Sequence, residues 1–125
     1  MIRILLAEDD QNMRTYLKRA LEHAGHAVVD CENGAEALGW LKNEIFDLLL
    51  SDIVMPEMDG IELAQHCADL APDTKVMFIT GFAAVSLRAN QAAPQAKMLS
   101  KPFHLKDLVR EVEHMFEDRL ALSSL

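Results

Sequence analysis

Five short apolar segments, separated by stretches with helical spacing, constrain the fold of this chain most. Each segment is strand-length and is apolar along most of its length, as strands buried on both faces of a parallel sheet are. Parallel strands need crossover connections, which are usually helices. The pattern therefore predicts βα units wound into a single sheet, with strands at residues 2–7, 27–31, 47–51, 75–80 and 96–100.

Four of the stretches that follow the apolar segments have a one-sided apolar stripe. The clearest runs from Leu105 to Phe116, and the stripe of the third stretch consists of Ile61, Ala64 and Ala68. The segment 83–95 is the exception, because its stripe is thin and Pro94 cannot continue a helix. We therefore expect an α/β fold with a doubly wound five-stranded parallel sheet, helices on both faces and a short or poorly ordered fourth helix.

Length and composition restrict the class of protein. The 125 residues suffice for one domain, which we expect to span residues 1–118, with a tail at 119–125. No apolar run approaches the roughly 20 residues of a membrane span, and the N-terminus does not resemble a signal peptide, so a cytoplasmic location is expected. The net charge of −8 argues against binding to nucleic acid. Cys31 and Cys67 have no metal-binding spacing and are expected to be free buried thiols.

Polar residues follow the apolar segments at the points where four predicted strands end. In an open α/β sheet, ligands bind beyond the carboxyl ends of the strands, and these ends meet at one edge. Carboxylates, a hydroxyl and an ammonium would therefore converge there, although they come from distant parts of the chain. The residues are Glu8, Asp9 and Asp10 after the first strand, Asp52 after the third, Thr80 after the fourth and Lys101 after the fifth.

Each of these residues alone has an ordinary explanation. Asp10 is placed to cap the first helix, Asp52 could be a turn residue, and Lys101 could be a solvated surface charge. Together they have a sharper meaning, because carboxylates held close together raise each other's pKa unless a cation neutralises them. Mg²⁺ prefers such oxygen ligands, and a carboxylate can accept a phosphoryl group. The cluster thus favours phosphoryl transfer onto an aspartate.

Four motifs, in this order, resemble those of the receiver domain of two-component response regulators. They are AEDD, LLLSDIVMPEMDG, FITG and LSKPF, and the resemblance extends to about Phe116. It implies a flavodoxin-like sheet with strand order 2-1-3-4-5. It also implies a set of site residues: Asp52 as phosphoacceptor; Glu8, Asp9, Asp52 and the Val54 carbonyl as Mg²⁺ ligands, with Asp9 the more direct; Thr80 as switch hydroxyl; Lys101 as phosphate contact; and a cis bond before Pro102.

The chain departs from the receiver pattern in its switch region. Receivers often have Tyr or Phe three residues before the lysine, where this chain has Met98. We hypothesise that the adaptable side chain of Met98, or nearby Phe82, takes the packing role while the fourth helix shifts. Val54 and Phe82 would flank the path of a hydrolytic water and so tune the lifetime of the phosphoryl group.

The stretches DIVMPEMDGIELA, KVMFITGFAAV and LSKPFHL are further similar to a stand-alone receiver of alphaproteobacterial cell-cycle control. This implies phosphorylation by a hybrid histidine kinase or a histidine phosphotransferase. It also implies that the unphosphorylated form primes the ClpXP protease by contacting ClpX. Because the chain ends after the fifth helix, we expect output through the face built from 83–95, 96–100 and 105–116.

Other functions remain open. A chemotaxis-like receiver or a phosphorelay intermediate would need the same site. A phosphatase working through an aspartyl phosphate would want an acid two residues after Asp52, where Val54 stands. A flavin or nucleotide carrier would want a glycine-rich loop in place of Glu8 to Asp10. The histidines His23, His26, His66 and His114 are expected to be solvated, and His104 to be structural or part of the output face.

Overall fold

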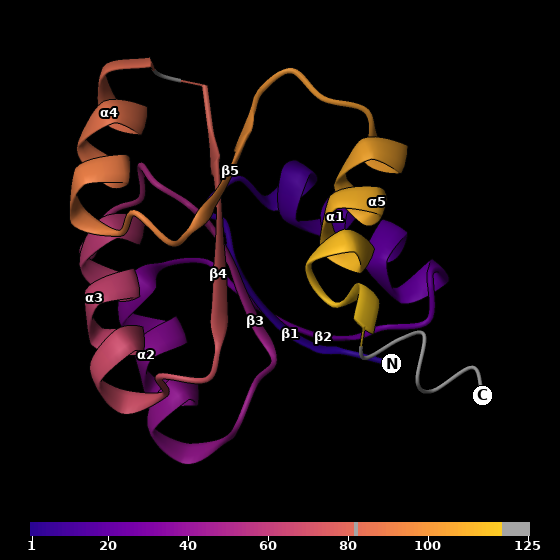
Figure 1. Ribbon diagram of the computed structural model, residues 1–125, viewed down its shortest axis with the longest axis horizontal. Coiled ribbons are helices and arrows are strands. Elements are labelled where there is room, and N and C mark those ends of the chain that lie inside the picture. Colours follow the sequence, from indigo (N-terminus) through magenta and orange to yellow (C-terminus); the bar gives the residue numbers. More distant parts are fainter. Residues whose placement is uncertain (82, 119–125) are drawn as a thin grey trace.

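The computed structural model of the protein describes residues 1–81 and 83–118. Within them, five parallel strands form one sheet in the order β2-β1-β3-β4-β5, which confirms the predicted topology (Figure 1). The strands are β1 (Arg3–Ala7), β2 (Ala27–Cys31), β3 (Leu48–Asp52), β4 (Lys75–Thr80) and β5 (Lys97–Ser100). The helices are α1 (Gln11–His23), α2 (Gly34–Asn43), α3 (Gly60–Leu70), α4 (Ala83–Ala92) and α5 (Leu105–Met115).

The helices cover both faces of the sheet. Helices α1 and α5 lie on one face, and α2, α3 and α4 lie on the other (Figure 1). Successive side chains of a strand point to opposite faces, so Ile4 and Leu6 pack under α1 and α5, whereas Leu5 and Ala7 pack under α2 and α3. Strands that are covered on both faces explain why the apolar segments do not alternate with polar residues.

Short polar side chains begin three of the helices. Asp10, Asn33 and Asp59 each accept a hydrogen bond from the backbone N–H three residues further on, at 2.9, 2.8 and 2.9 Å. Such a cap satisfies one of the unpaired N–H groups in the first helical turn. The capping role predicted for Asp10 is confirmed, and this cap residue lies three residues after the carboxyl end of β1, whereas the loop 53–59 separates β3 from α3.

Helix α4 has ten residues and ends before Pro94. Among the described residues it shares this length with α2, and the two are the shortest helices of the fold. The poor order expected of α4 stays a prediction that amide exchange can test. In α3, Ala68 is exposed and Cys67 is buried instead, so the predicted stripe was one residue out of place at its end.

The histidine at the amino end of β2 is not solvated. His26 is 7% exposed, and its Nδ1 accepts a hydrogen bond of 3.3 Å from the backbone N–H of Ile2. The prediction of a solvated His26 is therefore wrong, because the N-terminal residues cover this position. Cys31 and Cys67 are free and buried, as predicted.

Three predictions concern residues outside those described. They are the packing role of Phe82, its part in tuning the phosphoryl lifetime, and the tail at 119–125. Across the described part of the chain, every helix is too short or too polar to cross a membrane.

Candidate functional site

Three carboxylates meet at the carboxyl ends of the strands. Glu8 follows β1, Asp9 comes next in the chain, and Asp52 is the last residue of β3. One ligand atom from each lies within 4.8 Å of the others. Glu8 is fully buried and Asp52 is 8% exposed, whereas Asp9 is exposed. The residues that the sequence predicted to converge here do so, with two of the carboxylates held out of bulk water.

Lys101 supplies the positive charge of the cluster. Its Nζ lies 3.1 Å from Asp52 Oδ2 and 3.5 Å from Glu8 Oε1. Its backbone N–H donates to the carbonyl of Thr80 at 2.7 Å, which ties the end of β5 to the end of β4. Thr80 is 1% exposed, and the bond between Lys101 and Pro102 is cis, as predicted. The hydroxyl and the ammonium are thus placed by neighbouring strands.

The electrostatics of the cluster are unfavourable to ionised Glu8. Burial, and then the charge of Asp52, raise the pKa of Glu8 to about 8, although Lys101 lowers it in part. Burial alone would lower the pKa of Lys101, but its hydrogen bond to Asp52 and the charges of Asp52 and Glu8 outweigh this and raise it. The ammonium therefore stays charged, and it does not compensate two buried carboxylates.

The loop between β3 and α3 folds back over Asp52. The backbone N–H of Val54 donates to Asp52 Oδ1 at 3.2 Å, and the N–H of Gly60 donates to the carbonyl of Ile53 at 2.8 Å. A Cβ at position 60 would overlap the carbonyl oxygen of Asp52 and would lie 3.0 Å from the Cα of Ile53. Glycine at the start of α3 is therefore what lets the loop approach the site.

Comparison with known protein families agrees with this arrangement of carboxylates and lysine. The family model of the response regulator receiver domain matches residues 4–113. The chain belongs to the response regulator receiver family. Members of this family are signalling regulators of two-component systems, not classical enzymes.

Two relatives show which members of the receiver family have similar sequences. The receiver is 61% identical over 116 residues to the response regulator receiver protein CpdR of Brucella abortus, which covers 92% of this chain and 97% of that protein. It is also 39% identical over 119 residues to the sensor kinase CckA of the same organism, but there it spans only 12% of the relative.

Solved receiver structures share the fold. The receiver domain protein of Methanospirillum hungatei is 30% identical with a TM-score of 0.87, over 97% of this chain and 98% of that one. The response regulator TrrA of Thermotoga maritima, solved in complex with Mg²⁺-BeF, is 31% identical with a TM-score of 0.81, over 91% and 98% of the two chains.

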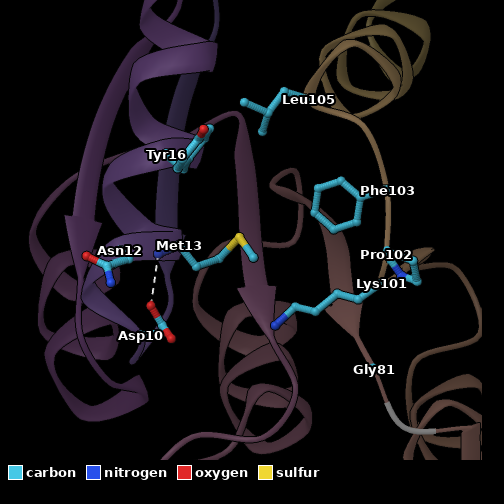
Figure 2. A pocket seen from close by; sticks show the side chains of 9 residues that line it. All are labelled: Asp10, Asn12, Met13, Tyr16, Gly81, Lys101, Pro102, Phe103 and Leu105. Carbon is cyan, nitrogen blue, oxygen red and sulfur yellow. Dashed lines mark hydrogen bonds between the residues drawn. The ribbon is translucent and has the colours of Figure 1, made fainter.

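Beside the carboxylates, the receiver has an open pocket of about 700 Å³. Figure 2 shows Lys101 reaching across it from the segment that follows β5 toward the start of α1. The sequence did not point to its other lining residues, among them Asn12, Tyr16 and Phe103. The spacing of Asn12 and Tyr16, which places both on one exposed face of α1, is the signal that could have found them.

The predicted switch residues are placed only in part. Met98 is half-buried on β5 and lies opposite Phe78 of β4 in the sheet register. It is therefore beside the strand that ends in Thr80. Val54 is 47% exposed at the mouth of the site, where it can be reached from solvent.

Proposed function

We propose that this chain accepts a phosphoryl group on Asp52 from a histidine phosphotransferase or a hybrid histidine kinase. The observation that carries the proposal is the environment of Asp52. This carboxylate is almost buried at a strand end, contacts the Lys101 ammonium at 3.1 Å and lies beside two further carboxylates. A carboxylate so placed is held ready as a nucleophile.

In the proposed transfer, a carboxylate oxygen of Asp52 forms a bond to phosphorus. The bond from phosphorus to the imidazole nitrogen of the donor breaks, and the electron pair stays on that nitrogen. Lys101 remains protonated and neutralises oxygen charge by a charge-assisted hydrogen bond. Hydrolysis of the acyl phosphate by water would return Asp52 to its free form, and Val54 at the mouth of the site would tune that rate.

The donor set fits Mg²⁺, with Glu8, Asp9, Asp52 and the carbonyl of Val54 as the residues that would hold it. Oxygen ligands suit this hard cation, and a cation would favour the ionised form of Glu8, whose pKa is raised by burial and then by the charge of Asp52. When bound, the cation supplies positive charge for the oxygens of the phosphoryl group.

Thr80 is the proposed switch residue, since its buried hydroxyl ends the strand beside Asp52. Met98 or Phe82 would repack as α4 shifts. The check is the amide shifts of residues 81–100 with and without a phosphate mimic. Identical spectra would show that the switch region does not respond.

For the output, we propose a protein contact that depends on phosphorylation, with the unphosphorylated form priming ClpXP through ClpX. Support comes from the 61% identity to CpdR over nearly the whole of both chains. The proposed contact face consists of α4, β5 and α5, in a domain that ends at about residue 118. A cytoplasmic setting without nucleic-acid partners accompanies this proposal.

The test is incubation with a small phosphodonor and Mg²⁺, followed by intact mass and by pull-down of purified ClpX. Wild type should gain an acid-labile phosphoryl mass and lose ClpX on phosphorylation. Asp52→Ala should gain no mass, and it should bind ClpX equally well with and without the phosphodonor. Asp69→Ala, an exposed position on α3, is the matched control and should behave as wild type.

The two parts of the proposal fail separately. A wild type that gains no phosphoryl mass would disprove phosphorylation. If phosphorylation occurs but neither state binds ClpX, the adaptor function fails. A chemotaxis-like receiver or a phosphorelay intermediate would then be favoured, the latter by the similarity to part of the sensor kinase CckA.

A further inference from the structure

Arg14 is a cation that the proposed chemistry does not use, although it lies beside the acidic cluster. It belongs to α1, and its side chain is only 15% exposed. Burial of a guanidinium is costly unless its donors are matched with acceptors. Two of its nitrogens are matched here, and their partners lie on different elements.

The first partner is the backbone of Glu8. Arg14 Nη1 donates to the Glu8 carbonyl at 2.9 Å, and the Glu8 N–H donates to the Cys31 carbonyl at 3.0 Å. The peptide groups on both sides of Glu8 are thus anchored, one by β2 and the other by Arg14. The Glu8 carbonyl belongs to the peptide that leads into Asp9, so the hydrogen bond from Arg14 holds one end of that peptide.

The second partner is Asp30 on β2. Its Oδ2 lies 3.2 Å from Arg14 Nε, and its Oδ1 accepts from Lys18 Nζ at 2.9 Å. Burial tends to raise the pKa of Asp30, but the hydrogen bond and charge of Lys18 and the charge of Arg14 outweigh this and lower it. Asp30 is therefore ionised and balances the charge of Arg14.

A purely structural role would be to tie α1 to β2 through Asp30. Lys18 already makes that tie, from the next turn of the same helix. The contact that Lys18 does not make is the one to the Glu8 carbonyl. The feature that sets Arg14 apart thus points at the loop that carries Glu8 and Asp9.

We propose that Arg14 is a positioning residue that orients the Glu8–Asp9 peptide for binding of a divalent cation, with Asp30 holding and neutralising its guanidinium. This inference rests on the proposed Mg²⁺ site. It assigns Arg14 no contact with the cation or with the phosphoryl group.

The sign of the effect separates positioning from simple charge. Removing a nearby positive charge should tighten binding of a cation if only Coulomb's law acts. Removing a residue that orients the ligand loop should weaken it, and loss of such a supporting contact around a metal site typically costs about 10–100-fold in affinity. The two explanations therefore predict opposite changes for Arg14→Ala.

The experiment is calorimetric titration of the metal-free protein with MgCl₂ at fixed ionic strength, with thermal melting of each metal-free variant. We expect Arg14→Ala to bind Mg²⁺ about tenfold more weakly, and Arg14→Lys about threefold, since lysine cannot reach both partners at once. Lys18→Ala is the matched control, because it also removes a cation from Asp30 but leaves the Glu8 contact. Its affinity should stay within about twofold of wild type.

The outcomes are distinct. Equal or tighter Mg²⁺ binding by a folded Arg14→Ala overturns the inference while leaving the proposed site intact. If Arg14→Ala does not fold, Arg14→Lys decides in the same way. A wild type that binds no Mg²⁺ removes the proposed metal site and this inference with it. In the metal-free protein, a change in the Asp9 amide shift in Arg14→Ala but not in Lys18→Ala would support the orienting role without any metal.

Discussion

The two ends of the sheet treat buried polar groups in opposite ways. At the amino ends of the strands, the backbone N–H of Arg3 donates to Asp47 Oδ2 at 2.8 Å, and the Thr74 hydroxyl donates to the carbonyl of Phe46 at 2.7 Å. At the carboxyl ends, Glu8 and Asp52 are buried together and share one ammonium. One end of the sheet thus pairs its polar groups within the fold, while the other holds two buried carboxylates against one ammonium, where a cation and a phosphoryl group are proposed to bind.

The largest expected effect tests how tightly the carboxyl end is packed. Gly60→Ala should destabilise the protein by about 3 kcal/mol, because the new Cβ would meet the carbonyl of Asp52 and backbone cannot move aside cheaply. Chemical denaturation measures the change. Gly39→Ala is the matched control, because a Cβ there meets nothing within 4 Å in the middle of α2.

For Gly39→Ala we expect a gain of up to about 1 kcal/mol from helix propensity. Equal stabilities of the two alanine variants would show that the loop over Asp52 is free to adjust, and that the carboxyl end is less constrained than its geometry indicates.

The second prediction concerns the cost of the buried charge. The pKa of Glu8 is raised from 4.5 in the unfolded chain to about 8 in the fold, so the folded state binds more protons between these values. The stability is therefore full below the unfolded pKa and is lost as the pH rises through about 8. Without metal, Glu8→Gln should be more stable than wild type by about 2 kcal/mol at about pH 8, and this gain should shrink toward about pH 5.

Urea denaturation in the presence of a chelator, at both pH values, measures this gain. If Glu8→Gln is no more stable than wild type at the higher pH, ionisation of Glu8 does not lower the free energy of unfolding. The contrast between the two ends of the sheet would then disappear.

At the amino end of the sheet, removing a buried polar group should lower the stability instead of raising it. Thr74→Val removes the donor to the Phe46 carbonyl and leaves a buried acceptor without it, so we expect a loss of about 1 kcal/mol. Thr15→Val, at an exposed position of α1, serves as the control and should change stability little. If Thr74→Val is more stable than wild type, buried polar groups lower the stability of the protein at this end of the sheet as well.

His26 is the exception at the amino end and has the smallest expected effect. Burial lowers its pKa, Glu113 raises it in part, and the N-terminus lowers it. Its Nε2 is buried and has no hydrogen-bond partner among the described residues. The unfolded chain therefore binds the proton more readily, and stability falls as the pH drops from about 6.5 through the lowered pKa.

His26→Gln should flatten the pH dependence of stability over this range. An NMR titration of wild type should give a His26 pKa below that of a model imidazole. A His26 pKa at or above the usual value would show that its protonated imidazole is stabilised by the fold, like the hydrogen-bonded groups at the amino ends of the strands.

The sequence predicted those parts of the molecule that depend on strand order alone. Glu8, Asp52, Thr80 and Lys101 each directly follow or end a strand, and parallel strands bring such positions together whatever the details of packing. The contacts of Arg14 and His26 could not be predicted from the sequence, because they depend on which groups of neighbouring elements pack against these side chains. The shift from Ala68 to Cys67 in α3 has the same origin, since a sparse stripe does not determine the rotation of a helix about its axis.

The ion pairs of Lys101 join residues that are 49 and 93 positions apart along the chain. The ammonium comes from the residue that follows the last strand, whereas Glu8 follows the first. A nascent or truncated chain that lacks β5 holds the acidic residues but not the charge that balances them. The proposed phosphorylation of Asp52, in which Lys101 neutralises oxygen charge, therefore needs residues from near both ends of the domain in place at once.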